Sequence, residues 1–153
     1  MAPKATRYNL VKVEQMENTF RTNVIAPLFL SRSMLPLMKN DQGSLIVNMS
    51  SILGSIENNK KVMESGGSGG GQYPYRSTKA ALNMVTRSLS IDLEHLNISV
   101  VSIHPGWVKT DMGGPYAHLK PEESIEGVLK VISEYKSHMN GEFMDYKGEI
   151  VPW

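Results

Sequence analysis

Tyr75 and Lys79 are four residues apart, a spacing that places two side chains on one face of a helix about one turn apart. An isolated phenol titrates near pH 10, roughly three units above neutrality, and a neighbouring cation favours its phenolate form. Lys79 is placed to be that cation, so the pair could perform acid/base chemistry. The spacing alone is weakly specific, because any amphipathic surface helix can carry the same two residues.

Ser51 and Asn23 are two further polar residues at positions that matter. Ser51 follows a mostly apolar run, where a hydroxyl could donate to a carbonyl substrate, although a turn-forming serine is the simpler alternative. Asn23 lies four residues before Pro27, which has no N–H to bond the Asn23 carbonyl. That carbonyl could hold a water molecule behind the lysine, and the alternative is an ordinary helix kink.

Hydrophobic periodicity predicts the elements that carry these residues. Apolar residues at helical spacing indicate long helices over 16–38 and 75–96, and a third that begins near Pro121. The inward stripe of this third helix is predicted to contain Ile125, Val128, Leu129, Ile132 and Tyr135. β-Branched and apolar runs indicate strands over 45–49 and 98–103, with a short final strand over 143–146. Residues 56–73 include a glycine-rich stretch and are predicted to form a mobile loop.

The order of strands and helices predicts an α/β fold with a parallel sheet and right-handed crossovers. Ligands of such sheets bind beyond the carboxyl ends of the strands. Ser50 and Ser51 follow the first strand, and Pro105 and Gly106 follow the second. We therefore expect these two segments to face one cleft.

Taken together, these segments resemble the short-chain dehydrogenase/reductase family, over nearly the whole chain. The resemblance is carried by four motifs, namely Phe20-Arg21-Thr22-Asn23-Val24, Ile46-Val47-Asn48-Met49-Ser50-Ser51, Tyr75-Arg76-Ser77-Thr78-Lys79 and Pro105-Gly106-Trp107-Val108-Lys109-Thr110. Within the family, the segments 50–55 and 104–114 are most similar to the C-factor and sniffer-type carbonyl reductases. The implied fold is the C-terminal part of a Rossmann-like, doubly wound parallel sheet.

The resemblance implies an NAD(P)-dependent oxidoreductase that reduces a small carbonyl or oxidises an alcohol, with NADPH favoured over NADH. Tyr75 would be the general acid or base, Ser51 would hydrogen-bond the reacting oxygen, and Asn23 would position a relay water. Lys79 would lower the pKa of Tyr75 and, with Tyr75, hold the nicotinamide ribose. The nicotinamide itself would be held by Pro105, Gly106, Val108 and Thr110.

The sequence departs from the family at its start, where members carry a TGxxxGxG turn that cradles the pyrophosphate and an NNAG motif. The whole chain is therefore predicted to be one partial Rossmann-like domain, residues 1–153. Its first strand would become an unpaired edge, and the helices around Phe20 and Leu82 would lose cover, which predicts a marginally stable or partner-dependent chain. A second interpretation is a shortened, non-catalytic interaction protein, and a third is a fragment with no independent role.

Composition excludes several other classes of function. The formal charge of +1 comes from 16 basic and 15 acidic residues without blocks, which argues against nucleic-acid partners. The absence of cysteine removes disulfides and thiolate chemistry, and the four histidines lack the spacing of zinc ligands, so no metal site is expected. No signal peptide or membrane-spanning run is apparent, and a cytoplasmic protein is expected. Family resemblance implies a homo-oligomer formed through the helices that contain Asn23 and Tyr75.

Overall fold

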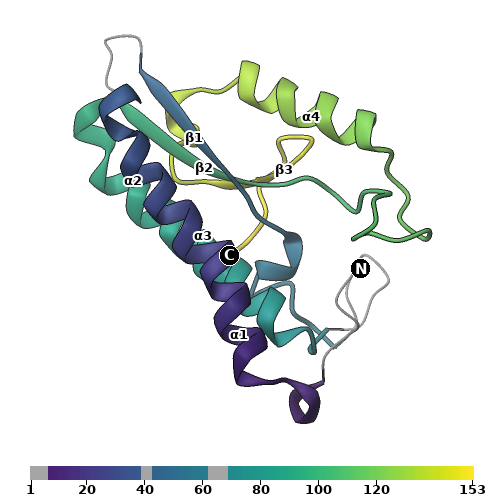
Figure 1. The fold of residues 1–153 in the computed structure, drawn as a ribbon. Helices are drawn as coiled ribbons and strands as arrows, with labels where there is room; N and C mark the ends of the chain where they lie inside the picture. Colours follow the sequence, from purple (N-terminus) through teal and green to yellow (C-terminus); the bar gives the residue numbers. More distant parts are fainter. Residues whose placement is uncertain (1–6, 39–42, 62–68) are drawn as a thin grey trace.

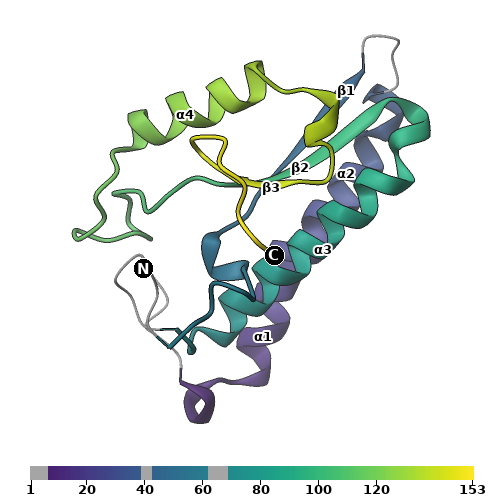
Figure 2. The same cartoon turned by 180° about the vertical axis from the view of Figure 1, so that it is seen from behind.

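The computed structural model of the chain describes residues 7–38, 43–61 and 69–153. Three parallel strands form one sheet in the order β1-β2-β3, with bounds Ser44–Met49, Ile98–His104 and Phe143–Asp145. Helices α1 (Val13–Phe20), α2 (Ala26–Met38) and α3 (Tyr73–Asp92) cover one face of the sheet, and α4 (Pro121–Ser133) lies on the other (Figures 1 and 2). The α/β class, the parallel sheet and the partial Rossmann-like architecture are confirmed.

Two apolar cores form on opposite faces of β2, because successive side chains of a strand point to opposite faces of the sheet. Val101 and Ile103 pack with residues of α4 and β3. Ile98 and Val100 pack instead with Leu93 and with partly buried residues of α2, α3 and β1. The central strand β2 is therefore covered on both sides, as expected for a parallel sheet.

The predicted long helix over 16–38 is continuous but contains a change of helix type. A π-helical turn, Arg21–Ile25, separates α1 from α2, and the Ala26 N–H donates to the Arg21 carbonyl five residues back. Pro27 follows directly after this turn and cannot donate to the Asn23 carbonyl. The predicted irregularity therefore lies at the expected place, as a wide turn of the kind often found at functional sites.

Helix α3 begins two residues earlier than the predicted start at Tyr75. Pro74 stands in its first turn, where a missing N–H has no helical partner to lose. Part of the predicted loop over 56–73 falls on residues 62–68, which lie outside the described residues. Near these residues, the Asn59 side chain accepts a hydrogen bond of 2.8 Å from the Gly70 N–H.

The predicted inward stripe of α4 is wrong at two positions. Ile125 and Leu129 are 51% and 58% exposed, and the buried residues are Ser124, Val128 and Val131. The Ser124 hydroxyl donates to the Pro105 carbonyl at 2.6 Å, which turns this face of the helix toward the sheet. The face that contacts the sheet is thus centred one residue away from the most apolar face.

The expectation of an exposed sheet edge and uncovered helices is correct in part. Strand β1 lies at the edge of the sheet in the described part of the chain. Leu82 is only 2% exposed, however, so the helix around it keeps its cover. The reason is that α3 packs against β2, which belongs to this chain. Within residues 7–38, 43–61 and 69–153, no helix has the length and hydropathy needed to cross a membrane.

Candidate active site

The ends of β1 and β2 bring two predicted segments to one edge of the sheet. The two strands pair in parallel with Met49 opposite Ile103, and the Ser50 N–H donates to the Ile103 carbonyl at 2.8 Å. Ser51 and Pro105 therefore leave the sheet at the same carboxyl edge. This is the edge where ligands bind in open α/β sheets.

Ser51, Tyr75 and Lys79 lie together at this edge. Ser51 is buried and shares a side-chain hydrogen bond with Tyr75. The Lys79 ammonium lies 5.6 Å from the centre of the Tyr75 ring and donates to the Met49 carbonyl at 2.7 Å. The structure thus places a phenol, a hydroxyl and an ammonium group beside the end of β1, as acid/base chemistry on a carbonyl requires.

Burial dominates the electrostatics of these groups. It raises the pKa of Tyr75, and the hydrogen bond from Ser51 opposes that rise. Burial also lowers the pKa of Lys79, since a low dielectric disfavours the ammonium form. The causes of the Tyr75 shift are its burial and Ser51, so the lowering of this pKa by Lys79 stays a prediction.

Asn23 contacts the same helix at a neighbouring residue. Its side-chain amide donates to the Thr78 hydroxyl at 3.0 Å, and that hydroxyl donates in turn to the backbone carbonyls of Pro74 and Tyr75. The π-helical turn is thereby tied to the first turn of α3. The Asn23 side chain thus supports the turn that carries Tyr75.

The segment after β2 is held to α4 and to itself. Gly106 has a positive φ of 85°, and a Cβ there would lie 2.7 Å from a Leu119 methyl carbon, so glycine is required. Val108 bridges to Leu119, and the Thr110 hydroxyl accepts from the Gly113 N–H at 3.1 Å. Pro105, Gly106, Val108 and Thr110 thus belong to one segment, held by these contacts, that follows β2.

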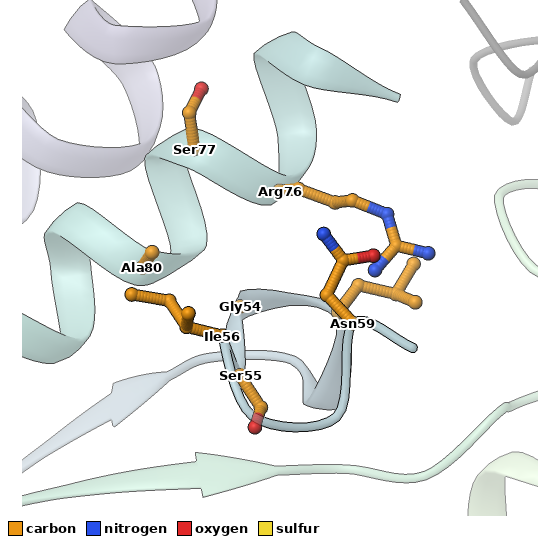
Figure 3. Close-up of a pocket in the computed structure, with 8 residues that line it drawn as sticks. Gly54, Ser55, Ile56, Asn59, Arg76, Ser77 and Ala80 are labelled. Atoms are coloured by element: carbon orange, nitrogen blue, oxygen red, sulfur yellow. The ribbon is translucent and has the colours of Figure 1, made fainter. Parts of the chain in front are cut away.

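A 3-10 turn, Ile52–Gly54, follows Ser51 and packs directly on α3. A Cβ at Gly54 would lie 2.8 Å from both the carbonyl carbon and the Cβ of Lys79. A pocket of about 170 Å³ lies between this loop and α3, with Arg76 and Asn59 in its wall (Figure 3). Neither Ser51 nor Tyr75 lines it, so this pocket is beside the candidate active site rather than part of it.

Two features near the site were not apparent from the sequence. Trp153 stacks on the buried Phe143 ring at 5.6 Å, and its carbonyl accepts from the Glu57 N–H at 3.0 Å, which anchors the loop after Ser51. Asn83 on α3 is buried and accepts a hydrogen bond from the Ser50 hydroxyl. The helical spacing of four residues from Lys79 to Asn83 was the one available signal.

Comparison with known proteins agrees with this geometry. The family model described as short chain dehydrogenase matches residues 3–120. The chain belongs to the short-chain dehydrogenase family. It is 40% identical to C-signal of Myxococcus xanthus over 143 residues, which cover 94% of this chain and 81% of C-signal.

Solved structures of carbonyl reductases resemble this short-chain dehydrogenase over its full length. Carbonyl reductase Sniffer of D. melanogaster matches with a TM-score of 0.91 and 41% identity, over 100% of this chain and 63% of Sniffer. NADPH-bound carbonyl reductase from chicken fatty liver matches with a TM-score of 0.86 and 34% identity, over 100% and 62%. The short-chain dehydrogenase described here thus spans somewhat less than two thirds of these two reductases.

Proposed function

We propose that this short-chain dehydrogenase reduces a small aldehyde or ketone, or oxidises the corresponding alcohol, with Tyr75 as the general acid or base. The observation that carries the proposal is the hydrogen bond between the Tyr75 phenol and Ser51, with Lys79 beside the ring. Tyr75 protonates the carbonyl oxygen during reduction, and Ser51 donates a hydrogen bond to that oxygen. Asn23 steadies the turn that holds Tyr75 and, through its backbone carbonyl, positions a relay water.

The residues present suit the nicotinamide half of NAD(P). Tyr75 and Lys79 present a hydroxyl and an ammonium group from one side of α3, which suits ribose hydroxyls. The segment that contains Pro105, Gly106, Val108 and Thr110 follows the end of the neighbouring strand β2. The cofactor supplies the hydride for the reduction. We favour NADPH over NADH, because solved relatives from chicken and from Burkholderia multivorans were determined with NADPH and NADP. No TGxxxGxG motif for the pyrophosphate occurs among residues 1–153.

The test combines binding with turnover. We expect the chain to quench or shift NADPH fluorescence on binding and to consume NADPH with a panel of small aldehydes and ketones. Tyr75→Phe should abolish turnover while NADPH binding and the circular dichroism spectrum persist. NADPH binding without turnover on any carbonyl, or turnover that survives Tyr75→Phe, would refute the assignment.

A second candidate function, a non-catalytic interaction protein, is favoured by an exposed apolar face on α2. This face comprises Phe29, Leu30, Met34 and Leu37, whose exposed fractions range from 41% to 77%. Exposed apolar surface of this kind often marks a protein contact. A homo-oligomer formed through the helices that contain Asn23 and Tyr75 would cover it, and light scattering at several protein concentrations tests that assembly.

A further inference from the structure

The interface of α3 with β1 and β2 changes from apolar to polar toward the active-site end. At the far end, Ile46, Ile98 and Val100 pack in an apolar cluster with residues of the helices. Two residues further along each strand, the corresponding positions are Asn48 and Ser102, and both side chains hydrogen-bond Thr86 of α3 at 2.9 and 2.8 Å. Polar residues at positions that face a core break the usual pattern of a buried strand.

Polar contacts between α3 and the residues at the end of β1 recur about one helical turn apart. Asn48 donates to Thr86, and the Ser50 hydroxyl donates to the Asn83 side-chain oxygen at 2.5 Å. One turn nearer the active site, Lys79 donates to the Met49 carbonyl, and one turn further Tyr75 meets Ser51. The last contact in this series is therefore that of Tyr75 with Ser51, the proposed catalytic pair.

The buried side chain of Asn83 is expected to lower the stability of the fold. It is 3% exposed, and its side-chain nitrogen has no hydrogen-bond partner in the part of the chain that the structure describes. A buried donor without a partner destabilises the folded state, whereas an apolar pair of similar shape would not. A hydrogen bond is directional, so it can fix the position of one element along another, whereas an apolar contact cannot.

We propose that Ser50 and Asn83 are positioning residues, which hold the register of α3 against β1 and so keep the Tyr75 phenol in hydrogen-bond reach of Ser51. The inference rests on the proposed function in one respect, namely that Tyr75 and Ser51 are the reacting pair. It goes beyond it by assigning a role to two buried side chains that are not among the proposed catalytic or cofactor-binding residues. Asn48 and Thr86 support the same register one turn further from the site.

The test measures whether the pKa of Tyr75 still depends on the Ser51 hydroxyl. The pKa of Tyr75 is followed by NMR in the full chain, with tyrosine isotopically labelled at Cζ, and its signal among the six tyrosines is assigned with Tyr75→Phe. In the parent chain, Ser51→Ala should raise this pKa, because it removes the hydrogen bond that lowers it. In the double variant Ser50→Ala/Asn83→Leu, the pKa should already be displaced, and adding Ser51→Ala should shift it no further.

Stability distinguishes a positioning role from a merely structural one. We expect the double variant to unfold at the same urea concentration as the parent, or a higher one, since it removes a buried unpaired donor. If it does not fold, Ser50→Ala alone deletes a single oxygen and provides the same comparison. Ser90→Ala is the matched control, because Ser90 is equally buried on α3 and bonds within its own helix.

Two outcomes would overturn the proposal. One is a Ser51→Ala shift of equal size in the parent and in the double variant. The other is that Ser51→Ala does not shift the Tyr75 pKa in the parent, which would mean that Tyr75 and Ser51 are not hydrogen-bonded. If the coupling is intact but the chain never turns over a carbonyl with NADPH, the positioning role is supported and only the proposed function fails.

Discussion

His104 should make the folded chain sensitive to acid. This histidine ends β2, lies opposite Asp145 of β3, and has its Nδ1 atom buried without a partner within the described residues. Burial lowers its pKa from 6.5 to about 4, and the nearby Asp145 carboxylate opposes that shift. His104 is therefore neutral in the folded chain at pH values where the unfolded chain already binds a proton.

The sign and size of the effect follow from this difference. Between pH 6.5 and 4 the unfolded chain binds more protons, so the free energy of unfolding falls as the pH falls through this window. A difference of about 2.5 pKa units at about 1.36 kcal/mol each gives a loss of about 3 kcal/mol on going from pH 7 to pH 4. Such a loss is a large part of the stability of a typical small domain.

The assay is urea unfolding of the parent and of His104→Leu at several pH values across this range. Carboxylates titrate in the same window, so the relevant quantity is the difference between the two chains. We expect His104→Leu to remove about 3 kcal/mol of the acid-induced loss. Asp145→Asn should instead make the parent slope steeper, because it removes the charge that raises the His104 pKa.

The matched control is His138→Leu, which replaces an exposed histidine instead of a partly buried one. An equal slope in the parent and in His104→Leu would refute the reasoning. It would mean that water or a rearrangement solvates His104 in the folded chain. The reasoning would also be refuted if His138→Leu flattened the slope as strongly as His104→Leu.

Two further substitutions test the packing around the site. Gly54→Ala should lower the unfolding free energy by about 1–3 kcal/mol, because its Cβ would press on the Lys79 backbone, and NMR should show the Tyr75 signal move. Gly127→Ala also clashes with backbone, but across the sheet on α4, so it should destabilise the fold while the Tyr75 signal stays in place. Glu123→Ala should lower the unfolding free energy by about 0.5–2 kcal/mol in urea, since its carboxylate accepts from the Lys120 N–H at the start of α4; an unchanged midpoint would contradict this.

The elements of this fold were predictable because their signals are local. Strands β1 and β2 are bounded by turn residues, and α4 begins at a proline, so each could be read from a short window. The shared edge of Ser51 and Pro105 followed from one general rule about parallel sheets. The positions that carry the candidate chemistry are therefore among the most predictable in the chain.

What could not be predicted depends on pairs of elements. The orientation of α4 is set by Ser124 and the Pro105 carbonyl, so the stripe through Ile125 and Leu129 gave the wrong inward face. The pKa of Tyr75 likewise depends on how deeply α3 is buried, which spacing on one helix does not reveal. Trp153 had no assignable role until its contact with Phe143 was known.

The contacts around the proposed acid/base group show which elements of the chain hold it in place. Ser51 follows β1, and Tyr75 and Lys79 lie on α3, which packs against β2 and is tied to the π-helical turn by the Asn23–Thr78 hydrogen bond. The groups proposed for proton transfer are therefore positioned by contacts among the described residues, and turnover depends on whether the nicotinamide can be held beside them.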